Sequence, residues 1–95
     1  MSEMRLRDQI KCIEEMIDYL GDFCKEMDDT IQGLDSDMLY LRANGFSVET
    51  EETYRQGYYQ PVKVQVDEVI ENIMTRHRDY LERVKERLEK AEKER

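Results

Sequence analysis

Residues 6–41 read LRDQIKCIEEMIDYLGDFCKEMDDTIQGLDSDMLYL, with apolar side chains at alternating spacings of four and three. This series consists of Leu6, Ile10, Ile13, Ile17, Leu20, Cys24, Met27, Ile31, Leu34, Met38 and Leu41. Such an unbroken a/d heptad pattern predicts one long helix that packs as in a left-handed coiled coil. With Ile10 as position a, Cys24 and Met38 are also a positions. We expect this first helix to span about residues 2–43.

The first helix is expected to end at Asn44-Gly45, because glycine readily adopts the left-handed conformation that follows a helix end. Ser47 is a good N-cap for a following helix. Glu49, Glu51 and Glu52 would place negative charge at the positive end of that helix. The sequence therefore predicts a reversing turn at residues 44–47.

A second helix is expected over about residues 48–93, interrupted near residues 57–61. Pro61 would clash with the carbonyl group of Gly57, so we expect a kink or a break there. The apolar face of this helix is predicted to comprise Val62, Val66, Val69/Ile70, Ile73, His77, Tyr80/Leu81, Val84, Leu88 and Ala91. An alternative is open, because Val62-Lys-Val-Gln-Val66 also alternates like a strand and could pair with residues 46–50.

Length and composition favour an all-α protein. The chain has 95 residues, of which 39% are hydrophobic and 40% charged, with four Gly, one Pro and no Trp. Such a high fraction of charged residues and so few of the Gly and Pro residues that form turns disfavour a β-sandwich, a barrel or a βαβ fold. We predict a single domain, residues 1–95, that folds as an antiparallel helical hairpin of two long helices.

Charge and hydropathy exclude several classes of partner. The net charge of −8 would repel a phosphate backbone, which argues against nucleic-acid binding. No apolar run approaches the roughly 20 residues that span a membrane, and no cleavable signal is visible at the N-terminus. Cys12 and Cys24 are too far apart on one helix to form a disulfide with each other. These features predict a cytoplasmic protein.

No motif predicts an enzyme, a cofactor, a metal site or a small-molecule substrate. His77 is the only histidine, and one His without paired cysteines makes no metal site. The sequence has no glycine-rich phosphate loop, no Cys-x-x-Cys and no nucleophile elbow. We interpret His77 as a partly buried structural or pH-sensitive residue of the second helix.

The first helix has more apolar width than a hairpin needs. Met16 and Phe23 lie at position g, and Cys12 and Tyr19 at position c. Met16 and Phe23 could widen the core of the hairpin itself. Alternatively, they form a surface for a second helical chain, which would complete a four-helix bundle. The predicted partner-binding residues are Cys12, Met16, Tyr19, Phe23, Tyr54 and Tyr58, the last two from one face of the second helix.

The chain resembles the WXG-type, ESAT-like helical hairpins of type VII secretion over nearly its whole length. The similarity lies in the layout of two helices around Ala43-Asn44-Gly45-Phe46, in Tyr54-x-x-x-Tyr58, and in Tyr80-Leu-Glu-Arg-Val84. The Trp of the family's Trp-x-Gly motif is absent, and only Gly45 matches it. The acid of the family's Tyr-x-x-x-Asp/Glu export signal is missing at Val84. The chain thus resembles a divergent member.

This resemblance implies a non-enzymatic adaptor or targeting partner for a larger helical protein, such as an LXG-type toxin, in a homodimer or heterodimer. It also implies possible export by a type VII system without a cleavable signal peptide. An alternative function is a cytoplasmic coiled-coil chaperone or structural adaptor, prefoldin-like if residues 46–66 form a β-hairpin.

Overall fold

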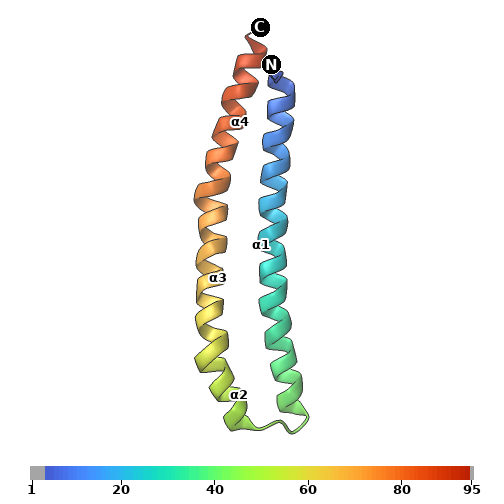
Figure 1. Ribbon diagram of the computed structural model, residues 1–95, viewed down its shortest axis with the longest axis vertical. Helices are drawn as coiled ribbons and strands as arrows, with labels where there is room; N and C mark the ends of the chain where they lie inside the picture. The colour runs from blue at the N-terminus through green and yellow to red at the C-terminus, as the bar shows by residue number, and fades with distance from the viewer. Residues whose placement is uncertain (1–3, 95) are drawn as a thin grey trace. The chain divides into compact units, whose positions relative to one another are not determined.

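The computed structural model describes residues 4–94, of which residues 6–43 and 48–93 are helical and are joined by one short turn. The helical segments are α1 (Leu6–Ala43), α2 (Val48–Tyr54), η1 (Arg55–Tyr59), α3 (Gln60–Asn72), η2 (Ile73–His77) and α4 (Arg78–Lys93), where η1 and η2 are π-helical (Figure 1). The expected start of the first helix, residue 2, lies outside the described residues. The all-α prediction is confirmed for the described part of the chain.

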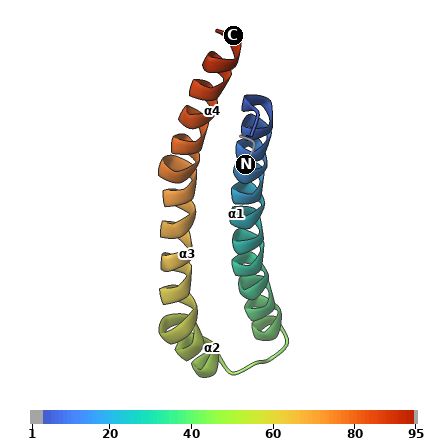
Figure 2. The ribbon, with the colours of Figure 1, turned by 45° about the horizontal axis from the view of Figure 1, so that its top comes forward.

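Two compact units divide the chain, and each is described by itself. Unit 2 comprises Cys24–Ile70. It is a helical hairpin, in which the C-terminal part of α1 lies beside α2, η1 and α3 (Figure 2). Ile31 and Met38 of α1 pack with Tyr59 of η1, and Val66 of α3 packs against them. This cluster is the apolar core of unit 2.

Within the described residues, unit 1 combines residues 4–23, which include the N-terminal part of α1, with residues 71–94. The two segments run antiparallel, side by side (Figure 1). The buried apolar side chains of this unit are Ile10, Ile17, Ile73 and Leu81. An ion pair joins the two helices, with Nζ of Lys85 lying 3.7 Å from Oε1 of Glu14.

The turn between α1 and α2 is built from local hydrogen bonds. Gly45 has φ of +86°, and the amide of Phe46 donates to the carbonyl of Leu41 over 2.9 Å. The amide of Gly45 also donates to the carbonyl of Arg42, which completes a Schellman motif at the end of α1. On the other side of the turn, Oγ of Ser47 accepts from the amide of Thr50 and caps α2.

The left-handed conformation of Gly45 leads to a stability prediction. Gly45→Val should lower the free energy of unfolding by about 1–3 kcal/mol, because a branched side chain is strained at positive φ. A Cβ atom at Gly45 or at Gly33 would meet no other atom within 4 Å, so crowding plays no part at either position. The control Gly33→Ala, inside α1, should raise stability by about 0.5–1 kcal/mol. Urea unfolding measures both, and equal effects would contradict the strain explanation.

Pro61 does not break the second helical run. Helical residues follow one another from Val48 to Lys93. Instead, the winding changes to π-type over Arg55–Tyr59, where the amide of Gln60 donates to the carbonyl of Arg55. This bonding pattern directly precedes Pro61, which has no amide hydrogen to donate. Of the expected kink or break, the break is not found, because the chain stays helical, but the helix does change type within the expected region.

The alternative β-hairpin over residues 46–66 is also wrong, since residues 4–94 contain no strand. The Ser47 cap and the acidic first turn start a helix at Val48. Pro61 could not donate to a strand ladder, and Val66 faces the core of unit 2 as part of a helix. The alternation of Val62, Val64 and Val66 therefore does not reflect a strand.

Candidate protein-binding surfaces

An exposed apolar stripe runs along α1 in unit 1. It consists of Cys12, Met16, Tyr19 and Phe23, which we call the outer stripe. All four side chains are exposed, with 67% of the Tyr19 surface accessible. Their spacings of four, three and four match those of the buried residues of the same helix, so α1 carries a second coiled-coil-like seam. The outer stripe contains four of the six predicted binding residues.

The position of the outer stripe within unit 1 follows from the ion pair between Glu14 and Lys85. Glu14 is at heptad position e, and Met16 and Phe23 are at position g. Positions e and g flank opposite sides of a coiled-coil seam. Since Glu14 and Lys85 meet on one side of the helix pair, the outer stripe borders the opposite side.

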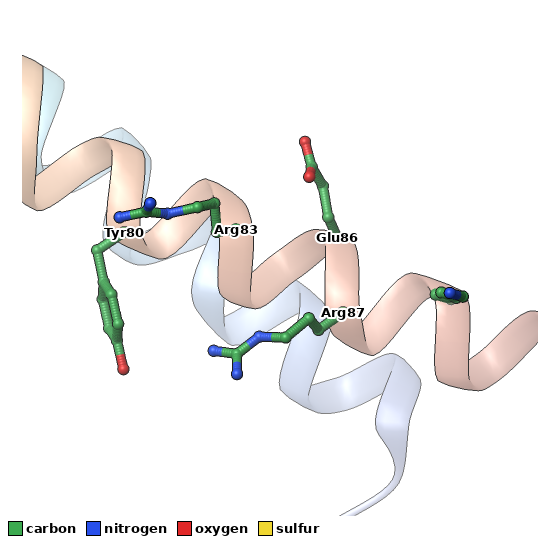
Figure 3. A pocket seen from close by; sticks show the side chains of 5 residues that line it. Tyr80, Arg83, Glu86 and Arg87 are labelled. Carbon is green, nitrogen blue, oxygen red and sulfur yellow. The ribbon is translucent and has the colours of Figure 1, made fainter.

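Helix α4 contributes a basic surface in the same unit. A shallow hollow of about 540 Å³ is lined by Tyr80, Arg83, Glu86, Arg87 and Lys90. Figure 3 shows Tyr80 and Arg87 directed away from the side to which Glu86 points. We call Tyr80, Arg83, Arg87 and Lys90 the α4 stripe. Sequence patterns alone do not identify these residues as one surface.

The other two predicted residues, Tyr54 and Tyr58, lie in unit 2. Their rings stack, with centroids 6.2 Å apart and planes inclined by 15°. Both side chains are exposed, Tyr58 more than Tyr54. Because the outer stripe belongs to unit 1, the six predicted residues form two separate groups, one in each unit.

Tyr54 also lines an apolar pocket of about 330 Å³ in unit 2. The apolar part of its wall comes from Leu34, Met38, Leu41, Phe46 and Tyr54. The C-terminal part of α1, the turn and α2 meet there. An apolar pocket of this size can receive a large apolar side chain of a partner protein.

A buried carboxylate, which the sequence pattern did not predict, lines this pocket. Glu51 keeps only 4% of its surface exposed. Nε of Arg55 donates to Oε1 of Glu51 over 3.0 Å, and Nη1 of Arg55 donates to Oδ1 of Asp35 on α1 over 2.8 Å. The hydrogen bonds to Asp35 and then to Glu51 raise the pKa of the Arg55 guanidinium above its ordinary value. Arg55 also lies over the ring of Tyr59, 5.7 Å from the centroid.

This network gives a prediction about Arg55. Arg55→Met should lower the thermal unfolding midpoint, because it leaves the Glu51 carboxylate buried with only the exposed Arg42, 3.8 Å away. The double variant Glu51→Met/Arg55→Met should be more stable than Arg55→Met alone, because it removes the uncompensated charge. Thermal melting followed by circular dichroism compares the two. A double variant less stable than the single one would show that burial of an unpaired Glu51 carboxylate costs little.

His77 is not on the apolar face that the sequence predicted. Its side chain is exposed, whereas Ile73 and Leu81 are buried and Arg78 is half-buried. His77 ends η2, where the amide of Arg78 donates to the carbonyl of Ile73. A π turn contains an extra residue relative to an α turn, so Arg78 takes the place that the heptad spacing gives to His77. The prediction of a partly buried His77 is wrong.

Among residues 4–94, no three His, Cys, Asp or Glu side chains are grouped so that they could hold a metal ion. No helix within the described part of the chain is long and apolar enough to span a bilayer. Comparisons with known proteins found no matching family model, no similar curated protein and no similar solved structure. The chain's own surfaces therefore have to support any functional proposal.

Proposed function

We propose that this protein is a non-enzymatic protein-binding module that forms a four-helix bundle with a second helical chain. The observation that carries this proposal is the outer stripe, which places a second apolar seam on the exposed side of α1. A patch of this kind, beside a buried seam and bordered by charged residues, is typical of a surface that another helix covers.

The thin core of each unit supports the same proposal. Tyr59 and Leu81 are the most buried apolar side chains among residues 4–94, and each still keeps 5% of its surface exposed. Two packed helices bury little apolar surface, and small helical scaffolds commonly gain the missing stability by association. A second chain over the outer stripe would add to the core of unit 1.

We further propose that the chain acts as a WXG-like adaptor, a targeting partner for a larger helical protein of a type VII system such as an LXG-type toxin. The support for this finer proposal is the resemblance of the sequence around Gly45 and the hairpin of unit 2. The absence of the family's Trp and export acid favours a partner that accompanies a secreted protein over one exported alone.

The test of this proposal is co-expression of the tagged full chain with an LXG-type protein of a type VII system. We expect a complex of fixed stoichiometry in size-exclusion chromatography with light scattering. Phe23→Asp should weaken the complex, whereas Glu89→Gln, at an exposed residue of α4 that does not line the hollow, should not. A chain that stays a folded monomer at high micromolar concentration and binds no helical partner would contradict the proposal.

A further inference from the structure

The pocket of unit 2 is held in shape by hydrogen bonds. The amide of Phe46 donates to the carbonyl of Leu41, which fixes the turn residue that forms part of the pocket wall. Arg55 donates to Glu51 and to Asp35 of α1, and so joins the two helical segments that supply the rest of the wall. A pocket formed in advance needs little ordering of the protein when a partner binds.

The apolar side chains of this pocket are only partly covered. Leu34, Leu41, Phe46 and Tyr54 each keep 37–42% of their surface exposed, whereas Met38 is buried. This apolar surface leaves water when a partner inserts a side chain, which favours binding. The pocket therefore selects a large apolar side chain such as leucine, methionine or phenylalanine.

The charged residues at the pocket are acidic. Asp37 and Glu51 line it, and Asp37 is exposed without an ion pair among residues 4–94. Unit 2, residues 24–70, carries ten acidic and four basic side chains. Three of the four basic residues, Arg42, Arg55 and Lys63, already pair with carboxylates of the same unit. A partner that carries positive charge is therefore favoured at this pocket.

The exposed ring of Tyr58 offers a second contact for a cation. It stacks on the ring of Tyr54, which lines the pocket, and keeps 66% of its surface exposed. The face of a tyrosine ring attracts Lys and Arg side chains. Asp37 belongs to α1 and Tyr58 to η1, so both helical segments of the hairpin present a group that favours a cation.

We propose that this pocket binds a basic segment of a partner protein. The segment inserts one leucine, methionine or phenylalanine among Leu34, Leu41 and Phe46, and its Lys or Arg side chains lie against Asp37 and Tyr58. Charge complementarity favours this occupant over a neutral or acidic segment, and over a second copy of unit 2, which would bring its own excess of carboxylates. The outer stripe belongs to unit 1, so the pocket adds a separate binding site to the proposed function.

Selection from a random peptide library displayed on phage tests which chemistry the pocket prefers. The immobilised full chain is the target. We expect the enriched peptides to share one leucine, methionine or phenylalanine and to carry more Lys and Arg than Asp and Glu. Enrichment of neutral or acidic peptides, or no enrichment, would contradict the proposed occupant.

The affinity of an enriched peptide, measured by fluorescence polarisation, locates its site. Leu41→Glu places a carboxylate in the pocket wall and should raise the dissociation constant at least about tenfold, as for loss of an apolar anchor. Leu39→Glu is the matched control, because Leu39 is an exposed residue of α1 that does not line the pocket. Nonspecific attraction of a basic peptide to an acidic protein would change the dissociation constant equally in both variants.

Reversal of the charge at Asp37 tests the electrostatic part. Asp37→Lys should raise the dissociation constant about two- to fivefold, as for loss of an exposed ion pair. Asp29→Lys makes the same charge change at an exposed residue of α1 that does not line the pocket, and should have a smaller effect. Circular dichroism verifies that each variant is helical.

A peptide that binds Leu41→Glu or Asp37→Lys as tightly as the wild type overturns the inference. Phe23→Asp should leave peptide affinity unchanged, because Phe23 lies in unit 1. Loss of peptide binding in the pocket variants and loss of the helical partner in Phe23→Asp are therefore separate results. Either site can fail while the other is retained.

Discussion

Tyr59→Ala is expected to lower the free energy of unfolding by about 3–5 kcal/mol, the range for deletion of a buried aromatic side chain. Only 5% of the Tyr59 surface is exposed, and the ring packs with Ile31 and Met38 of α1. It also carries the contact with the Arg55 guanidinium. Its removal would therefore open a cavity in the core of unit 2 and loosen the neighbouring charge network.

The neighbouring Tyr58 is a matched control, because it has the same side chain and lies in the same π-helical segment. Its surface is 66% exposed, and its ring stacks on that of Tyr54. Tyr58→Ala should cost no more than about 1 kcal/mol, the range for an aromatic pair. Urea unfolding at fixed protein concentration compares the two variants. If both have the same effect, Tyr59 does not form the core of unit 2.

The core face of α1 could be predicted from the sequence. The five a positions, Ile10, Ile17, Cys24, Ile31 and Met38, are all buried. A continuous α-helix keeps the heptad phase over its whole length, so spacing alone identifies the face. The d positions nearest the turn are Leu34 and Leu41. Their side chains line the pocket of unit 2 and are more exposed to solvent than the a positions.

The core face of the second helical run was predicted less well. Tyr59 was missed, and Val62, which was placed on this face, is exposed. In each of the predicted pairs Val69/Ile70 and Tyr80/Leu81, the second residue lies on the core face and the first is exposed. Heptad spacing assumes α-helical winding, whereas η1 and η2 each change the phase of the residues that follow them. Near η1 the buried or half-buried positions fall every four residues, at Glu51, Arg55, Tyr59 and Lys63. Apolar periodicity could not identify this face because three of these four residues are charged.

The candidate surfaces were also predicted only in part. Cys12, Met16, Tyr19 and Phe23 are exposed, as a binding surface requires, but their binding stays a prediction. The Glu51 network could have been suspected from its spacing, since Glu51 and Arg55 are an i,i+4 pair. The bond from Arg55 to Asp35 joins residues 20 apart and depends on how the hairpin closes. No local pattern predicts such a contact.

Ile17 and Phe23 lie on the same helix and are expected to separate folding from association. Ile17 keeps 9% of its surface exposed and faces the core of unit 1, whereas Phe23 keeps 48% exposed in the outer stripe. Ile17→Ala should therefore lower the free energy of unfolding by about 2–5 kcal/mol. Phe23→Ala should leave the helical content nearly unchanged and weaken binding to the second chain by about 1–3 kcal/mol, as for a moderate aromatic anchor.

Two measurements on each variant make this comparison: urea unfolding followed by circular dichroism, and affinity by calorimetry or ultracentrifugation. Unfolding is followed at a concentration well below the dissociation constant, because association itself stabilises the folded state. If Phe23→Ala unfolds the chain while binding per folded molecule stays the same, Phe23 belongs to the core of the hairpin. The binding surface would then lie in unit 2, where the exposed Tyr58 and the apolar pocket beside Tyr54 offer the next contacts for a partner.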